Sequence, residues 1–175
     1  MPVSGGVSCS SGPPRPGQIR DHGSMPETLN ITWEALDHLV ARLAQRVGRE
    51  FDLVVAISRG GLVPAGMLAY RLDLREILVA GAVFYRPEGG THPAPVIGHF
   101  PDAALLAGQR ILVVDEVWET GETMTEVLGR IRAAGGRPTS AVIHYKPGRS
   151  RVSGAPDHYA DTVHDWVTYP YKAGA

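Results

Sequence analysis

Several carboxylates follow a run of apolar residues in the stretch 111–123, which reads ILVVDEVWETGET. Asp115 and Glu116 are adjacent, and Glu119 comes shortly after them. A pair of carboxylates at the end of a buried strand is costly to remove from water unless donors or a cation satisfy it. Sugar hydroxyls could donate to one carboxylate, and a hard cation such as Mg²⁺ could bind the other. The pair therefore indicates a site for a sugar and a metal ion.

Hydroxyls and backbone amides come directly after the acids, in Thr120, Gly121, Glu122 and Thr123. We expect a helix over residues 122–134, and the amino end of a helix attracts anions. The segment therefore predicts a site for one phosphate group. A simple capped helix with acids near its positive end would account for Thr120 and Glu122. It would not account for three acids within one short turn.

A second loop of interest, residues 58–61, reads SRGG and follows the apolar stretch 51–57. Two glycines allow the backbone to come close to a ligand and to point amides at it. The guanidinium of Arg59 suits phosphate, and the following helix presents its positive end to the same place. A tight turn that happens to contain an arginine is the alternative, and the residues alone leave both interpretations open.

Apolar strands alternate with helices along the chain. Thr32 is placed to cap a helix, because apolar residues recur after it at helical spacing. We expect helices over residues 33–48, 62–72 and 122–134, and strands over 51–57, 77–85, 110–114 and 140–145. This order predicts an α/β fold with a mostly parallel central sheet flanked by helices. Residues 86–109 are expected to be a long functional or mobile connection. The segment after residue 145 is expected to be irregular, apart from a short extended piece near residues 161–167.

Composition limits the class of protein. The 175 residues suit one domain. The net charge of -1 argues against non-specific electrostatic binding of nucleic acid by the whole protein surface. The single cysteine excludes an internal disulfide, and we find no apolar run long enough to span a membrane, so a cytoplasmic location is expected. Residues 1–24 are rich in Gly, Ser and Pro and predict a disordered tail, which leaves residues 25–175 as the domain.

The motif over residues 113–123 resembles the signature of the type I phosphoribosyltransferases, which is an apolar strand, two acids, a spacer and Thr-Gly-x-Thr. Other stretches are similar to the bacterial xanthine-guanine (6-oxopurine) branch of that family: ITW at 31–33, SRGGLVP at 58–64, YKP at 145–147 and DWV at 165–167. The resemblance implies the type I phosphoribosyltransferase fold, with a small C-terminal hood mainly over residues 145–175. It also implies a homo-oligomer, a dimer or a tetramer.

The implied reaction transfers a 5-phosphoribosyl group from 5-phosphoribosyl 1-diphosphate to hypoxanthine, guanine or xanthine, with Mg²⁺, in purine salvage. Pyrophosphate is released. By resemblance, Arg59 and Gly60 would hold the pyrophosphate, and Asp115 and Glu116 would hold the ribose hydroxyls and the metal. Thr120, Gly121, Glu122 and Thr123 would surround the 5-phosphate.

On the base side, the resemblance makes Glu119 the acid/base at the purine ring nitrogen, although the family usually has Asp there. Lys146 would donate to the exocyclic oxygen, Trp166 would stack on the base, and Val167 would add main-chain contacts. A surface lysine and a core tryptophan are the plain alternatives. Trp118 is assigned no role.

The sequence departs from the family in two further places. No Lys or Arg lies between residues 87 and 109, where the family's mobile loop carries basic residues, and no acid follows Asp165. Two other functions therefore stay open. One is a regulatory protein that binds the diphosphate without catalysis, and the other is a phosphoribosyltransferase for another acceptor.

Overall fold

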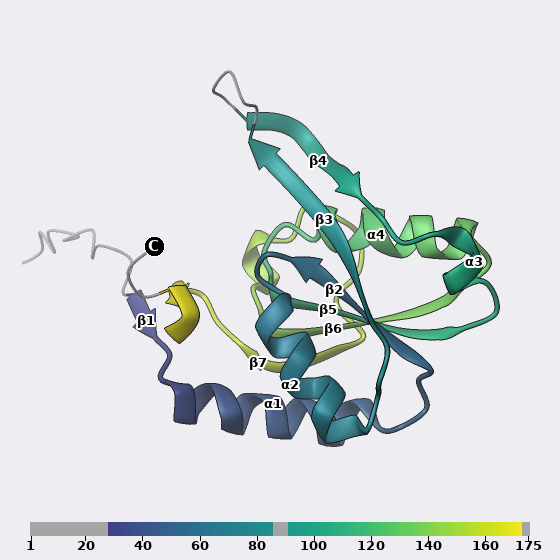
Figure 1. The fold of residues 1–175 in the computed structure, drawn as a ribbon. Coiled ribbons are helices and arrows are strands. Elements are labelled where there is room, and N and C mark those ends of the chain that lie inside the picture. The colour runs from purple at the N-terminus through teal and green to yellow at the C-terminus, as the bar shows by residue number, and fades with distance from the viewer. Residues whose placement is uncertain (1–27, 86–90, 173–175) are drawn as a thin grey trace, which may run out of the picture.

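The computed structural model describes residues 28–85 and 91–172. Its main sheet has six strands in the order β4-β3-β2-β5-β6-β7 (Figure 1). The pair β3–β4 is antiparallel, and the other neighbours are parallel. The strands are β2 (Leu53–Ser58), β3 (Ile77–Tyr85), β4 (Thr91–His99), β5 (Arg110–Trp118), β6 (Arg137–Tyr145) and β7 (His158–Thr162). The predicted α/β class with a mostly parallel sheet is confirmed.

Helices cover both faces of this sheet (Figure 1). α1 (Trp33–Val47) and α2 (Leu62–Leu72) pack on one face, and α4 (Glu122–Ala133) packs on the other. Alternate residues of β5 enter the two cores: Leu112 and Val114 face α1 and α2, whereas Ile111 and Val113 face α4. An uninterrupted apolar strand is what a sheet covered on both faces requires.

Three predicted helices form close to their expected limits. The cap of α1 is the expected one, because the side-chain oxygen of Thr32 accepts a hydrogen bond from the amide of Ala35 at 3.2 Å. The amino ends of α2 and α4 follow β2 and β5 directly, so both open at the same edge of the sheet. None of the helices in the described ranges is long and apolar enough to cross a membrane.

The expectation of one long connection over residues 86–109 was wrong in part. β4 (Thr91–His99) pairs with β3 and forms an arm that extends beyond the sheet, and the short helix α3 (Ala103–Leu106) follows it (Figure 1). Pro95 and Gly98 lie within β4, and because neither residue type is typical of strands, the sequence did not indicate a strand here. Because β4 is at the edge of the sheet, a proline there removes no hydrogen bond from a central ladder. The predicted tail, residues 1–24, falls outside the described residues.

The predicted end of the third strand was also wrong. β5 continues past Val114 to Trp118, and its last residues, Val117 and Trp118, pair with His144 and Tyr145 of β6. The acidic pair therefore lies within the last part of the strand rather than after it. The ladder with β6 fixes the backbone that carries these carboxylates.

The last part of the chain is more regular than expected. After β7, the strand β8 (Trp166–Thr168) pairs in parallel with β1 (Thr28–Asn30) in a separate two-stranded sheet. Short 3₁₀ helices occupy Pro147–Arg149 and Pro170–Lys172. Val163, Val167 and Tyr169 enter the same core as α1. This packing holds the end of the chain over the edge of the sheet where the predicted site residues lie.

Candidate active site

The two predicted loops meet above the parallel pair β2 and β5. A Cβ atom built on Gly60 would lie 2.6 Å from the Cδ atom of Glu116. One built on Gly61 would lie 2.3 Å from the carbonyl oxygen of Val114. No side chain fits at either position, so both glycines are required by the close approach of the loop to β5. In open parallel sheets this edge, beyond the carboxyl ends of the strands, is where ligands bind.

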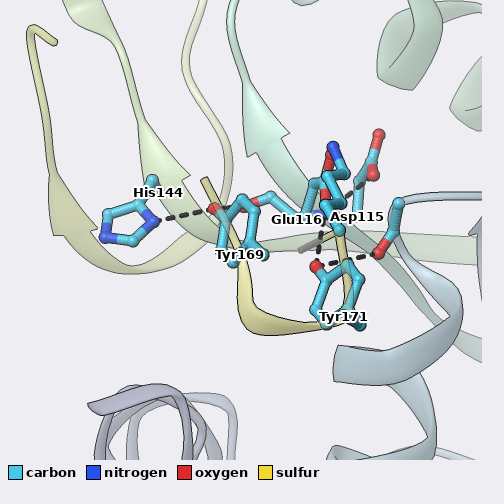
Figure 2. A network of polar contacts seen from close by, with 7 residues as sticks. Asp115, Glu116, His144, Tyr169 and Tyr171 are labelled. Atoms are coloured by element: carbon cyan, nitrogen blue, oxygen red, sulfur yellow. Dashed lines mark hydrogen bonds and ion pairs between the residues drawn. The ribbon is translucent and has the colours of Figure 1, made fainter. Parts of the chain in front are cut away.

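Glu116 is held by the end of its own chain (Figure 2). Its side chain is only 9% exposed, and its Oε2 atom accepts a hydrogen bond from the Tyr171 hydroxyl at 2.8 Å. Its Oε1 atom forms an ion pair with the Lys172 ammonium. The Tyr171 oxygen also lies 3.3 Å from the carbonyl oxygen of Gly60. Residues 171 and 172 therefore touch both predicted substrate loops.

Asp115 has a different environment from its neighbour. Burial, together with the negative charge of Glu116, raises the pKa of Asp115 to about 8. Its Oδ1 atom accepts the amide of Glu116 at 2.7 Å, which opposes this shift. A bound cation or a sugar hydroxyl would favour the charged form of the carboxyl.

The donors at this place fit a magnesium ion that arrives with a substrate. Mg²⁺ prefers oxygen ligands and is usually held by one or two carboxylates, substrate phosphates and waters. Asp115 offers such a carboxylate, whereas both oxygens of Glu116 already have partners. Within residues 28–85 and 91–172, no three His, Cys, Asp or Glu side chains gather into a complete metal cage. Substrate oxygens would therefore have to supply the other ligands.

A buried polar pair lies behind the acids (Figure 2). The hydroxyl of Tyr169 donates to the carbonyl oxygen of Glu116 at 2.8 Å and lies 2.8 Å from Nδ1 of His144. Because the hydroxyl has one hydrogen, which goes to the carbonyl, His144 must donate from Nδ1. Burial lowers the pKa of His144 to about 4, so the ring is neutral at physiological pH. This network fixes residue 169 beside the site.

The predicted phosphate loop is built on Trp118. Gly121 has φ of 82°, and a Cβ atom there would lie 2.6 Å from the Trp118 ring. Trp118 is buried, and its Nε1 donates to the hydroxyl oxygen of Ser150 at 3.3 Å. The hydroxyl of Thr120 donates to the carboxylate of Glu122 at 3.0 Å. Trp118, to which the sequence assigned no role, therefore packs against the loop and holds its backbone in place.

Lys146 and Trp166 form a second part of the site. The Lys146 side chain is buried, and its Nζ lies 3.3 Å from Oε1 of Glu119 and 5.3 Å from the centroid of the Trp166 ring. Arg149 also reaches Glu119, at 3.6 Å. Trp166 is 59% exposed, so it is not a core residue, and Lys146 is not a surface lysine. A pocket of about 160 Å³ lies here, and its lining includes Glu119, Lys146, Trp166, Val167 and Lys172.

The structure brings most of the predicted residues to one edge of the sheet. Arg59 is exposed in its loop and forms no ion pair with any residue that the structure describes. Sequence reasoning missed Tyr169, Tyr171 and Lys172. Their signal is weak, because the contact of Tyr171 with Glu116 spans 55 positions and follows no spacing rule.

A sequence profile of the phosphoribosyl transferase domain matches residues 30–171. The chain belongs to this family of enzymes. Xanthine-guanine phosphoribosyltransferase of Gluconobacter oxydans is 32% identical over 83% of this chain and 87% of its own length. Orotate phosphoribosyltransferase of Pyrobaculum islandicum is 29% identical, over 67% of this chain and 53% of its own length.

A solved structure agrees with this assignment. The purine phosphoribosyltransferase from Pyrococcus horikoshii Ot3 has a TM-score of 0.68 and 28% identity, over 83% of this chain and 93% of that one. The resemblance inferred from the motifs at residues 58–64 and 113–123 is therefore confirmed for the family and its fold.

Proposed function

We propose that this phosphoribosyltransferase transfers the 5-phosphoribosyl group to a 6-oxopurine base, with release of pyrophosphate, in purine salvage. One observation carries the proposal: the buried Lys146 ammonium, the exposed Trp166 ring and the Glu119 carboxylate lie around one pocket. An aromatic face suits a planar base, an ammonium suits an exocyclic oxygen, and a carboxylate suits a ring N–H. Val167, which lines the same pocket, supplies main-chain contacts to the base.

The phosphoribosyl part of the substrate occupies the two loops. Arg59 and Gly60 bind the pyrophosphate, and Asp115 and Glu116 bind the ribose hydroxyls and Mg²⁺. The 5-phosphate binds at the start of α4, where Gly121 and Thr123 offer amides and Thr120 and Glu122 shape the turn. When bound, Mg²⁺ neutralises charge on the diphosphate leaving group.

The chemical step forms one bond and breaks another. A purine ring nitrogen attacks the anomeric carbon, the bond from this carbon to the diphosphate oxygen breaks, and the ring proton passes to Glu119. Positive charge develops on the sugar ring, so positioning and electrostatic stabilisation provide most of the catalysis. Glu119 is one methylene longer than Asp, and its contact with Lys146 at 3.3 Å orients the longer side chain.

A different acceptor is the second candidate. The similarity to an orotate phosphoribosyltransferase, 29% identical over 118 residues, favours it. Lys146 with Trp166 argues for the purine. A binding protein without turnover is the remaining alternative.

A panel of acceptors separates these functions. The full chain is incubated with 5-phosphoribosyl 1-diphosphate, Mg²⁺ and hypoxanthine, guanine, xanthine, adenine or orotate, each alone, and the nucleotide product is identified by mass. Product from a 6-oxopurine that is lost in Glu119→Gln supports the proposal. Arg130→Met, which removes an exposed cation paired with Glu126, is the control and should keep activity. Product from orotate alone, or tight diphosphate binding with no product, would contradict the proposal.

A further inference from the structure

The carboxylate of Glu116 is neutralised by the end of its own chain. The Lys172 ammonium pairs with Oε1, and the Tyr171 hydroxyl donates to Oε2 at 2.8 Å. The Glu116 side chain is 9% exposed, whereas that of Lys172 is 46% exposed. A carboxylate that is withdrawn from water to this extent requires a counter-charge, because an uncompensated buried charge is strongly destabilising.

Packed aromatic residues position Lys172 beside Glu116. The rings of Tyr169 and Tyr171 stack with centroids 5.5 Å apart and 12° between their planes, and Trp33 of α1 packs on Tyr171 at 6.3 Å. The Lys172 ammonium also lies 5.8 Å from the centroid of the Tyr169 ring. The backbone that leads to Lys172 is therefore fixed, which reduces the ordering entropy that the pair has to offset.

This pair differs from the surface pairs of the same protein. In the pair of Arg42 with Asp161, both side chains are more than half exposed. Such a pair contributes little to stability, because water screens both charges. In the pair of Lys172 with Glu116, the acid is buried and its second oxygen is also bonded, so the ammonium is the main charge that compensates it.

We propose that Lys172 is the resident counter-cation of Glu116 and competes with a divalent cation for that carboxylate. The enzyme without substrate then binds no divalent cation at Glu116. Asp115 would then be the available protein carboxylate for a metal that the diphosphate of the substrate also holds. The assignment of the metal to the diphosphate rests on the proposed function, whereas the competition at Glu116 does not.

Replacement of Lys172 by an uncharged residue of similar length has a defined consequence. In Lys172→Met, the buried carboxylate of Glu116 loses its paired cation, and its neighbour Asp115 loses a favourable positive charge. A divalent cation can then compensate the negative charge of these carboxylates. Any ligand that binds only the folded state raises the melting temperature. The variant should therefore gain a dependence on metal that the natural sequence lacks.

The test uses the full chain without substrate and needs no turnover. Thermal melting is followed with a chelator and with millimolar Mg²⁺, and Mn²⁺ binding is titrated by electron paramagnetic resonance. We expect Lys172→Met to melt at a lower temperature than the natural chain in chelator, and to recover with Mg²⁺. We also expect it to bind Mn²⁺ about tenfold more tightly or better, which corresponds to about 1.4 kcal/mol. Lys172→Arg keeps the charge and should behave as the natural chain.

Arg42→Met is the matched control, since it removes a cation from a surface pair and should gain no response to metal. If Lys172→Met does not fold, Lys172→Gln has an amide that can still donate to Glu116 and serves in its place. An equal response of the natural chain and the variant to Mg²⁺ and Mn²⁺ would overturn the inference. Because no base is present, that outcome is independent of whether the enzyme uses a 6-oxopurine.

Discussion

The Tyr171 hydroxyl lies 2.8 Å from Oε2 of Glu116 and 3.3 Å from the carbonyl oxygen of Gly60, so one side chain connects the two proposed substrate loops. Burial, together with the charge of Glu116, raises the pKa of Tyr171, so the hydroxyl keeps its proton and remains a donor. Tyr171 thus takes part in shaping a candidate site whose acidic residue Glu116 lies 55 positions earlier.

Tyr171→Phe removes this donor and keeps the ring. A hydrogen bond to a charged group contributes about 1.5–3 kcal/mol, so the free energy of unfolding should fall by a similar amount. Because Glu116 and Gly60 lose their common partner, the KM for 5-phosphoribosyl 1-diphosphate should rise several-fold, with little change in the KM for the base. Steady-state kinetics and urea unfolding measure both. Tyr70→Phe, at a residue that is 92% exposed, is the control. An unchanged KM for the diphosphate would show that Tyr171 does not contribute to substrate binding.

Gly60→Ala should nearly abolish activity. The added Cβ would lie 2.6 Å from Cδ of Glu116, so either the loop or the carboxylate must move. Displacement by about 1 Å at a site that works by positioning is sufficient for a loss of about a hundredfold in kcat/KM. Gly66→Ala is the matched control, because nothing lies within 4 Å of a Cβ atom at this position in α2. The control should keep full activity and gain up to about 1 kcal/mol in stability, since Ala favours the helix. Similar activity in the two variants would show that the contact is unimportant.

His144 should make the protein sensitive to mild acid. Burial lowers the pKa of His144 from 6.5 to about 4, so the unfolded chain binds a proton in this range and the folded chain does not. The stability that the neutral His144 ring contributes is therefore fully present above pH 6.5, and it is lost as the pH falls from 6.5 to 4. The loss is about 3 kcal/mol, because each pKa unit corresponds to about 1.4 kcal/mol.

The comparison of His144→Gln with the natural chain isolates this effect. The variant should start with lower stability, since it changes the bond to Tyr169, and should lose less stability between pH 6.5 and pH 4. His38→Gln, at an exposed position of α1, should leave the natural pH profile intact. Urea unfolding at a series of pH values measures all three. A pH profile of His144→Gln that runs parallel to the natural one would rule out His144 as the source.

Much of the fold could be predicted because its signals are local. Thr32 before an apolar helical repeat predicted α1, and the uninterrupted apolar run of β5 predicted a strand covered on both faces. The glycines of the two loops are visible in the sequence as turn signals, although the close approach of Gly60 to Glu116 that they permit joins distant segments. The motifs therefore predicted the family, and the structure brings them together at the candidate site.

The missed features depend on contacts between distant segments. β4 contains proline and glycine and forms a strand only because β3 offers it an edge. β5 continues through Asp115 and Glu116 because β6 pairs with its last residues. The contacts of Tyr169, Tyr171 and Lys172 with Glu116 depend on the packing of the last described residues on the core that contains α1. No spacing within the sequence marks any of these contacts.

The contribution of Lys146 to base selection tests the central claim, transfer to a 6-oxopurine, most directly. We would measure kcat/KM for hypoxanthine and for adenine, which lacks the 6-oxygen, in the natural chain, in Lys146→Met and in Arg149→Met. Arg149 also pairs with Glu119 but is mostly exposed, so its loss leaves the donor to the base in place. We predict that the natural chain and Arg149→Met prefer hypoxanthine, and that Lys146→Met loses about a hundredfold of that preference. An equal preference in all three proteins, or a natural preference for adenine, would contradict the proposed function.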